Sequence, residues 1–199
     1  TVEGVSEYAL PNGLRILLIP DSTRPTVTAN VVYFVGSRNE GYGEAGMAHL
    51  LEHLLFLGST RHPNMFAEQT RLGSRRSGGT TSDHTYYIET VPAVDSVVDW
   101  ALDLQADRMV NALISSRSLA TEFSVVRNEL EQDESDAATA ARTRLFAAAF
   151  RAHAYGRPTS GTVSDIENVP VERIRAFYRR YYQPDNAMLV VAGRFAPQR

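Results

Sequence analysis

The stretch Gly46-Met-Ala-His-Leu-Leu-Glu-His-Leu-Leu-Phe-Leu-Gly58 decides how this chain folds and what chemistry it can hold. It is apolar almost throughout, which predicts a buried helix that ends at Gly58. On a helix His49 and His53 lie about 40° apart around the axis, and Glu52 falls about 60° to the other side of His49. Burying these three groups without partners would be costly, and a metal ion would remove that cost.

Two imidazoles and a carboxylate on one helix face form half of a catalytic zinc site. Zinc in such sites takes three nitrogen or oxygen ligands and leaves a fourth position for water, whose proton a neighbouring carboxylate can accept. The pattern HxxEH also occurs by chance, and a single histidine in an apolar helix more often bonds a backbone carbonyl. A zinc site therefore requires a third ligand elsewhere in the chain.

The acidic segment after residue 118 offers that third ligand. Glu122 and Glu129 are seven residues apart, so on a helix they lie within about 20° of each other beside an apolar stripe. Glu131 lies roughly opposite Glu122 and is expected to face solvent. Taken alone, this segment is equally typical of a solvated helix surface, and only the pairing with HxxEH favours Glu129 as a ligand. Three histidines without helical spacing to the motif remain as weaker alternatives: His62, His84 and His153.

The order and spacing of these groups resemble the N-terminal catalytic domain of the pitrilysin/insulinase family of zinc peptidases, the inverzincins. In that family HxxEH comes first and the third ligand follows about 75 residues later, with another glutamate seven positions before it. Here 75 residues lie between His53 and Glu129, and Glu122 occupies the matching place. Similar segments run along most of the chain: Leu10–Arg15, Gly43–Ala48, Val125–Glu129, Tyr155–Pro158, Tyr181–Asn186 and Met188–Gly193.

The resemblance implies a zinc-dependent endopeptidase domain that hydrolyses peptide bonds of oligopeptides or unfolded polypeptides. It implies one Zn²⁺ per domain, held by His49, His53 and Glu129. Glu52 would act as the general base. Glu122 would complete the catalytic set as the group that orients a ligand.

Family members commonly carry an Asn-Ala-x-Thr stretch on a strand beside the metal, where the strand edge holds the substrate backbone. The matching residues here are Ser77, Gly78, Gly79 and Thr80, so the asparagine is missing. Glycines still offer backbone N–H and C=O groups. The resemblance therefore implies that a peptide substrate binds as an added strand along these four residues.

The periodicity of the chain predicts an α+β fold with a mixed, mainly antiparallel sheet and helices packed on one face. The resemblance implies the same architecture, that of mitochondrial-processing-peptidase-like and LuxS-like metallohydrolases. Pro11-Asn12-Gly13 is a strong turn signal and predicts an N-terminal hairpin. The predicted strands are 6–10, 14–19, 27–35, 74–81, 85–91 and 187–192. The predicted helices are 47–58, 66–72, 94–109, 118–134, 139–153 and 171–182.

Composition indicates one domain over residues 1–199. The chain is 43% hydrophobic with a formal net charge of −3, which suggests neither a nucleic-acid surface nor a membrane surface. No apolar run is long enough for a membrane span. The sequence has no cysteine, which excludes disulfides, thiol catalysis and cysteine ligands.

The resemblance also implies partners and a compartment. We expect this domain to be the N-terminal part of a longer multi-domain or heterodimeric protein, in which a second homologous domain or subunit completes the substrate chamber. The isolated chain is then expected to be weakly active or inactive. By analogy with bacterial family members we expect a periplasmic or secreted protein, with the cytoplasm as the alternative. The alternative function is a non-catalytic zinc-binding partner or scaffold subunit of the same family.

Overall fold

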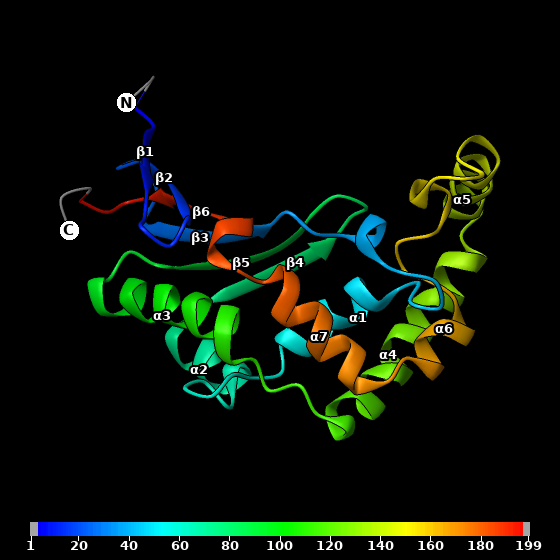
Figure 1. Cartoon of the computed structure of the whole chain (residues 1–199). Coiled ribbons are helices and arrows are strands. Elements are labelled where there is room, and N and C mark those ends of the chain that lie inside the picture. The colour runs from blue at the N-terminus through cyan, green and yellow to red at the C-terminus, as the bar shows by residue number, and fades with distance from the viewer. Residues whose placement is uncertain (1–3, 197–199) are drawn as a thin grey trace.

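Six strands form one sheet in the order β1-β2-β6-β3-β5-β4, with helices gathered beneath it (Figure 1). This computed structural model describes residues 4–196. The strands are β1 (Ser6–Ala9), β2 (Arg15–Pro20), β3 (Thr26–Tyr33), β4 (Arg75–Thr80), β5 (Thr85–Pro92) and β6 (Ala187–Gly193). All neighbouring strands are antiparallel except β2 and β6, which are parallel. The predicted α+β fold with a mixed, mainly antiparallel sheet is confirmed.

The centre of the sheet is β3, which pairs with β6 on one side and β5 on the other. Side chains along β3 and β5 alternate strictly between buried and half-buried, as a strand with one face on the core requires. The strand β4 pairs only with β5 and lies at one edge. The predicted hairpin is present as β1 and β2.

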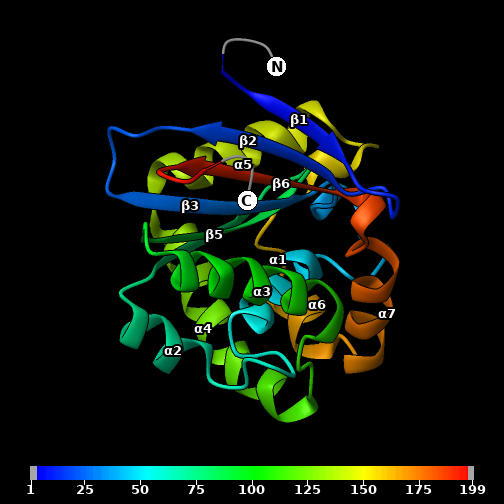
Figure 2. The same cartoon turned by 90° about the vertical axis from the view of Figure 1, so that its left-hand side faces the viewer.

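The helices lie on one side of the sheet in two perpendicular views, except α5, which stands beyond its end (Figures 1 and 2). They are α1 (Met47–Leu55), α2 (Met65–Leu72), α3 (Asp95–Asn111), α4 (Ser116–Ser135), α5 (Ala137–Ala149), α6 (Val163–Asn168) and α7 (Val171–Tyr181). Short 3-10 turns cover Ser37–Asn39, Ala154–Gly156 and Pro184–Asn186. Between residues 4 and 196, no helix combines the length and apolar character needed to cross a membrane.

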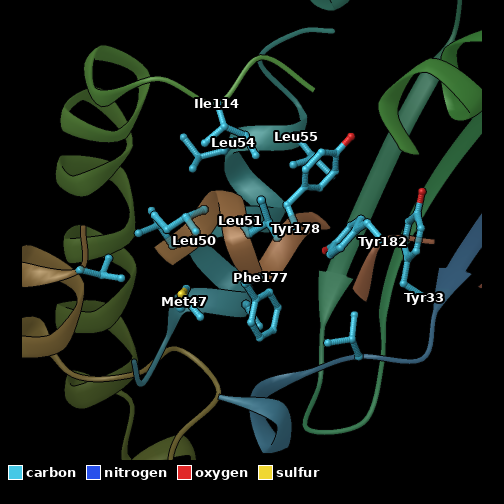
Figure 3. Packing of buried hydrophobic residues seen from close by; sticks show 14 of the residues in the cluster. Tyr33, Met47, Leu50, Leu51, Leu54, Leu55, Ile114, Phe177, Tyr178 and Tyr182 are labelled. Atoms are coloured by element: carbon cyan, nitrogen blue, oxygen red, sulfur yellow. The ribbon is translucent and has the colours of Figure 1, made fainter. Parts of the chain in front are cut away.

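The helix α1 runs through the main core, as its sequence predicts. Leu50, Leu51, Leu54 and Leu55 are each 0% exposed. They pack between α4, α7 and the aromatic side chains beside the sheet (Figure 3). Each buried leucine contributes roughly 1.5–3 kcal/mol of transfer free energy. Because its apolar faces are all covered, α1 holds its remaining polar face in a fixed direction.

Behind the edge strand a buried ion pair joins α3 to β5. Arg108 Nη2 lies 3.1 Å from Glu89 Oε1, and both side chains are 0% exposed. Gln69 and Ser74 donate further hydrogen bonds to the same carboxylate, both at 2.7 Å. The Arg108 guanidinium also stacks over the ring of Phe56, 5.2 Å from its centroid. This network therefore fixes the residue that follows α1.

Two helices end three or four residues before the predicted residue. The helix α1 ends at Leu55, with Phe56 as its C-cap in the right-handed region, so the prediction that it ends at Gly58 was wrong. A Cβ at Gly58 would lie 2.9 Å from the Pro63 carbonyl oxygen, so the tight loop that follows, and not a cap, favours glycine there. The helix α5 ends at Ala149, before the predicted residue 153.

Candidate metal centre and active site

The helices α1 and α4 bring His49, His53 and Glu129 together. The Nε2 atoms of the two histidines are 3.3 Å apart, and Glu129 Oε2 lies 3.5 Å from that of His49 and 3.3 Å from that of His53. A tetrahedral zinc ion with bonds of about 2.0–2.2 Å holds its ligand atoms about 3.3–3.6 Å apart. The spacing of these three atoms therefore matches three corners of a zinc site.

The protonation of the histidines also suits a metal. Burial lowers the pKa of His49 to about 4, and the neighbouring His53 adds to this effect. His49 is therefore neutral at pH 7, and its Nε2 can offer a lone pair. On the far side of the second ring, His53 Nδ1 lies 3.3 Å from Glu122 Oε2. Donation of the Nδ1–H to that carboxylate leaves Nε2 of His53 free for a metal.

The donor set fits zinc rather than a harder ion. Two imidazole nitrogens and one carboxylate oxygen are the ligands of many catalytic zinc sites, whereas magnesium and calcium prefer oxygen alone. Within residues 4–196 these are the only three such groups close enough to share one ion. The buried Nδ1 atom of His49 has no hydrogen-bond partner among residues 4–196. The residues present are thus compatible with one Zn²⁺.

Beside the cluster, Glu52 is suited to accept a proton. Its side chain is 7% exposed, and burial raises its pKa while a hydrogen bond from Thr80 opposes the rise. That bond runs from Thr80 Oγ1 to Glu52 Oε2 at 2.8 Å. A carboxylate with a raised pKa is a stronger base than a solvated one. The contact also ties α1 to the last residue of the edge strand.

A cavity of about 440 Å³ opens over the cluster. It is lined by His49, Glu52, His53, Phe56, Gly78, Gly79, Thr80 and Glu129. A Cβ at Gly78 would lie 2.7 Å from the Phe56 ring and 3.1 Å from Glu52 Oε1. The glycine therefore lets the edge strand approach the acid closely.

The predicted edge Ser77–Thr80 is only partly brought to this cavity. Gly78, Gly79 and Thr80 line it, whereas Ser77 is exposed on β4 and is not among the lining residues. Phe56 was not singled out from the sequence. Its spacing of three residues from His53, which puts it on the same side of the helix, was the available signal.

The remaining acidic and histidine candidates lie outside the cluster. Glu131 is exposed and pairs with Arg127 at 3.1 Å, as its predicted solvent-facing position requires. His62 is held by Glu68 at 2.7 Å and by Asp103 at 3.1 Å. The other two histidines contact neighbours of their own: His84 with Thr81, and His153 with Tyr155.

Replacing Glu122 should weaken zinc binding without removing it. Glu122 is 8% exposed, and its carboxylate can accept the hydrogen bond that orients His53. Loss of such a partner typically lowers metal affinity about 10–100-fold, so Glu122→Gln is expected to raise the zinc Kd by about tenfold. Competition with a chromophoric chelator measures this, with Glu131→Gln on the same helix as control. An unchanged Kd would remove Glu122 from its orienting role.

Fold and site together define a metallohydrolase-type α+β domain, with a His-His-Glu cluster and an adjacent buried glutamate. The family model described as Insulinase (Peptidase family M16) matches residues 15–163. The chain belongs to this family.

Relatives with similar sequences include zinc proteases that are longer than this chain. An uncharacterised zinc protease of Mycobacterium leprae is 32% identical over 192 residues, which cover 96% of this chain and 43% of that protein. A protease from Helicobacter pylori has a similar structure, with 29% identity and a TM-score of 0.90 over 98% of this chain and 47% of that one. The chain thus spans less than half the length of the curated relatives it matches.

Two further structures show that the fold extends across the family. The periplasmic protease PqqL of Escherichia coli has a TM-score of 0.91 at 22% identity, over 98% of this chain and 22% of that one. An inactive M16 peptidase domain of Pseudomonas fluorescens has a TM-score of 0.86 at 18% identity, over 98% of this chain and 47% of that one. At these identities the likeness concerns the fold alone, and an inactive member shares it.

Proposed function

We propose that this domain is a zinc-dependent endopeptidase. The observation that carries the proposal is the tetrahedral spacing of His49, His53 and Glu129 beside the buried carboxylate of Glu52. The zinc protease relatives support the same metal and reaction. In this proposal one Zn²⁺ binds per domain through those three ligands.

The proposed mechanism is hydrolysis of a peptide bond by water. Bound zinc would supply Lewis-acid polarisation of the scissile carbonyl and of the attacking water. Glu52 accepts the proton of that water and then passes it to the leaving amine. Thr80 keeps the Glu52 carboxylate aimed at the cavity through its hydrogen bond. Glu122 keeps the His53 ring in place from behind.

The substrate in this proposal is an extended peptide added to the edge of the sheet. One side of β4 pairs with β5, with Gly78 opposite Tyr87 and Gly79 opposite Tyr86, and its other side is the sheet edge. Backbone groups on such an edge bind a peptide of any sequence, which suits oligopeptides and unfolded polypeptides. A larger groove of about 670 Å³ continues from His49 and Glu129 toward α5 and gives the peptide room beyond the metal.

Whole-protein properties follow as further proposals. Because relatives and solved structures are at least twice as long, we infer that a second homologous domain or subunit completes the substrate chamber. The chain alone is then a weak enzyme. By analogy with bacterial members of the family we propose a periplasmic or secreted location, with the cytoplasm as the alternative.

A non-catalytic partner or scaffold is the second candidate function. The inactive domain of Pseudomonas fluorescens favours it, because that domain has the same fold. Against it, this chain keeps both histidines, Glu52 and Glu129 in contact with one cavity. A scaffold has no need of a buried carboxylate next to three groups spaced for one metal ion.

Metal removal distinguishes the two functions. Purified full-length protein is expected to contain about one zinc per HxxEH domain. It should cleave a quenched peptide, lose that activity in a chelator and regain it when zinc is restored. The isolated 199-residue chain serves as the matched control and should bind zinc but cleave poorly. Stoichiometric zinc without cleavage by the full-length protein would favour the scaffold, and absence of zinc would exclude both assignments.

A further inference from the structure

The helix that carries the histidines begins without a side-chain cap of its own. Its N-cap is Gly46, in the left-handed region at φ 92°, and a glycine offers no capping oxygen. A Cβ at this position would lie 2.6 Å from the Ser160 carbonyl oxygen and 2.9 Å from Gly161 Cα. The first backbone N–H groups of a helix have no partner within it. Any group that caps α1 must therefore reach it from elsewhere.

Glu40 provides that cap from the preceding loop. Its Oε1 accepts the Ala48 N–H at 2.8 Å, and its Oε2 accepts the Gly46 N–H at 3.1 Å. The residue is 5% exposed, so both bonds are shielded from water. A carboxylate at the start of a helix also interacts favourably with the helix dipole. The bond to Ala48 ends one residue before His49.

The loop that carries Glu40 is itself fixed to the end of the edge strand. Ser37 N–H donates to the Thr81 carbonyl at 3.1 Å, and Arg38 N–H donates to that of Ser82 at 3.0 Å. On the opposite side, Arg157 Nη2 donates to the Glu40 carbonyl oxygen at 2.9 Å. Thr81 directly follows Thr80, which bonds Glu52. Hydrogen bonds at both ends of the short segment 37–40 therefore join the end of β4 to the start of α1.

We propose that Glu40 is a positioning residue of the metal centre, which fixes the first turn of α1, and with it the His49 ring, relative to the strand edge. The proposal rests on the proposed zinc site. It assigns Glu40 no contact with metal or substrate. The function of the carboxylate is to prevent α1 from rotating or sliding, because a displacement of His49 would change the angle at which Nε2 meets the ion.

Glutamine at position 40 tests the proposal with little change in volume. Its amide oxygen can accept one of the two N–H bonds, whereas its NH₂ group would face the other N–H donor. Glu44→Gln is the matched control. Glu44 lies in the same loop, accepts the Gly41 N–H at 2.7 Å and pairs with Arg173 at 3.0 Å, but its side chain makes no bond to α1. Both substitutions remove one negative charge.

Two measurements on the 199-residue chain separate positioning from simple stability. The first is the zinc Kd, by chelator competition at 25 °C, where circular dichroism shows each variant folded. The second is the visible spectrum of the Co²⁺-loaded chain, which reports coordination geometry. Because burial raises the pKa of Glu40 to about 7, both are made at about pH 8, where the carboxylate is ionised.

Glu40→Gln is expected to weaken zinc binding about tenfold, the lower end of the effect of groups that orient metal ligands. Its Co²⁺ bands should shift or lose intensity, while Glu44→Gln matches the original chain in both. A Kd and spectrum unchanged in folded Glu40→Gln would overturn the proposal, even if that variant melts earlier. If Glu40→Gln does not fold, Glu40→Asp decides by the same two criteria. Failure of the unsubstituted chain to bind zinc would instead overturn the proposed function.

Discussion

Glu52→Gln is expected to leave zinc in place and abolish peptide cleavage. Glutamine keeps the shape of the side chain and can still accept the Thr80 hydrogen bond, which is 2.8 Å long in the native protein. It cannot accept a proton from water. A general base contributes roughly 10²–10⁴-fold to rate, so kcat of the full-length protein should fall at least about a hundredfold. Turnover of a quenched peptide and metal content of the same sample measure the two effects.

The separation of zinc binding from turnover is what identifies a base. Glu52 lines the cavity but is not one of the three residues whose atoms are spaced for a metal. Its replacement should therefore not change the zinc content. Glu131→Gln, which removes a carboxylate from the exposed face of α4, should change neither quantity. Activity of Glu52→Gln within about tenfold of the original would mean that another group takes the proton.

The His-His-Glu cluster could be predicted from the sequence because helical geometry is local. The separation of four residues fixes His49 and His53 on one face of any helix, and seven residues do the same for Glu122 and Glu129. Which of the two glutamates would meet the histidines depends on how α4 packs on α1. The resemblance to known peptidases supplied that choice, and the structure places Glu129 toward both Nε2 atoms and Glu122 behind His53.

The strands were predictable for similar reasons, but their immediate surroundings were not. Alternation and the turn at Pro11-Asn12-Gly13 locate the strands. Nothing periodic indicates that Glu40 caps α1, that Phe56 borders the cavity, or that Gly58 lies against Pro63. Each of these contacts is set by a bend in the loops around α1, where the chain follows neither the helical nor the strand period.

Gly58 shows how a glycine can mislead the prediction of a helix end. Glycine after an apolar helix usually marks a left-handed C-cap, and the sequence does not reveal that the loop folds back to place Pro63 against Gly58. The helix ends at Leu55, and the Phe56 side chain that follows lies against Gly78 and under the Arg108 guanidinium. Of the three residues predicted as helix beyond Leu55, Phe56 lines the cavity and Gly58 lies against Pro63.

His53→Ala should remove zinc from the domain. Nε2 of His53 lies 3.3 Å from both other ligand atoms, and its Nδ1 lies 3.3 Å from Glu122, so the substitution deletes one ligand and leaves Glu122 without its partner. Loss of an orienting group alone costs about 10–100-fold in affinity, so loss of a ligand should raise the zinc Kd about a thousandfold or more. Metal analysis after gel filtration measures the loss.

A histidine outside the cluster provides the comparison for this result. His153 caps a short turn by accepting the Tyr155 N–H at 3.2 Å and is not among the three groups that could share an ion, so His153→Ala should keep its zinc. Loss of zinc from both variants would point to general unfolding, which circular dichroism would reveal. Full retention by folded His53→Ala would show that the metal binds elsewhere. The expected pattern, loss at position 53 alone, would tie the ion to the face of α1 that meets Glu129, because no other pair of described elements offers three such groups together.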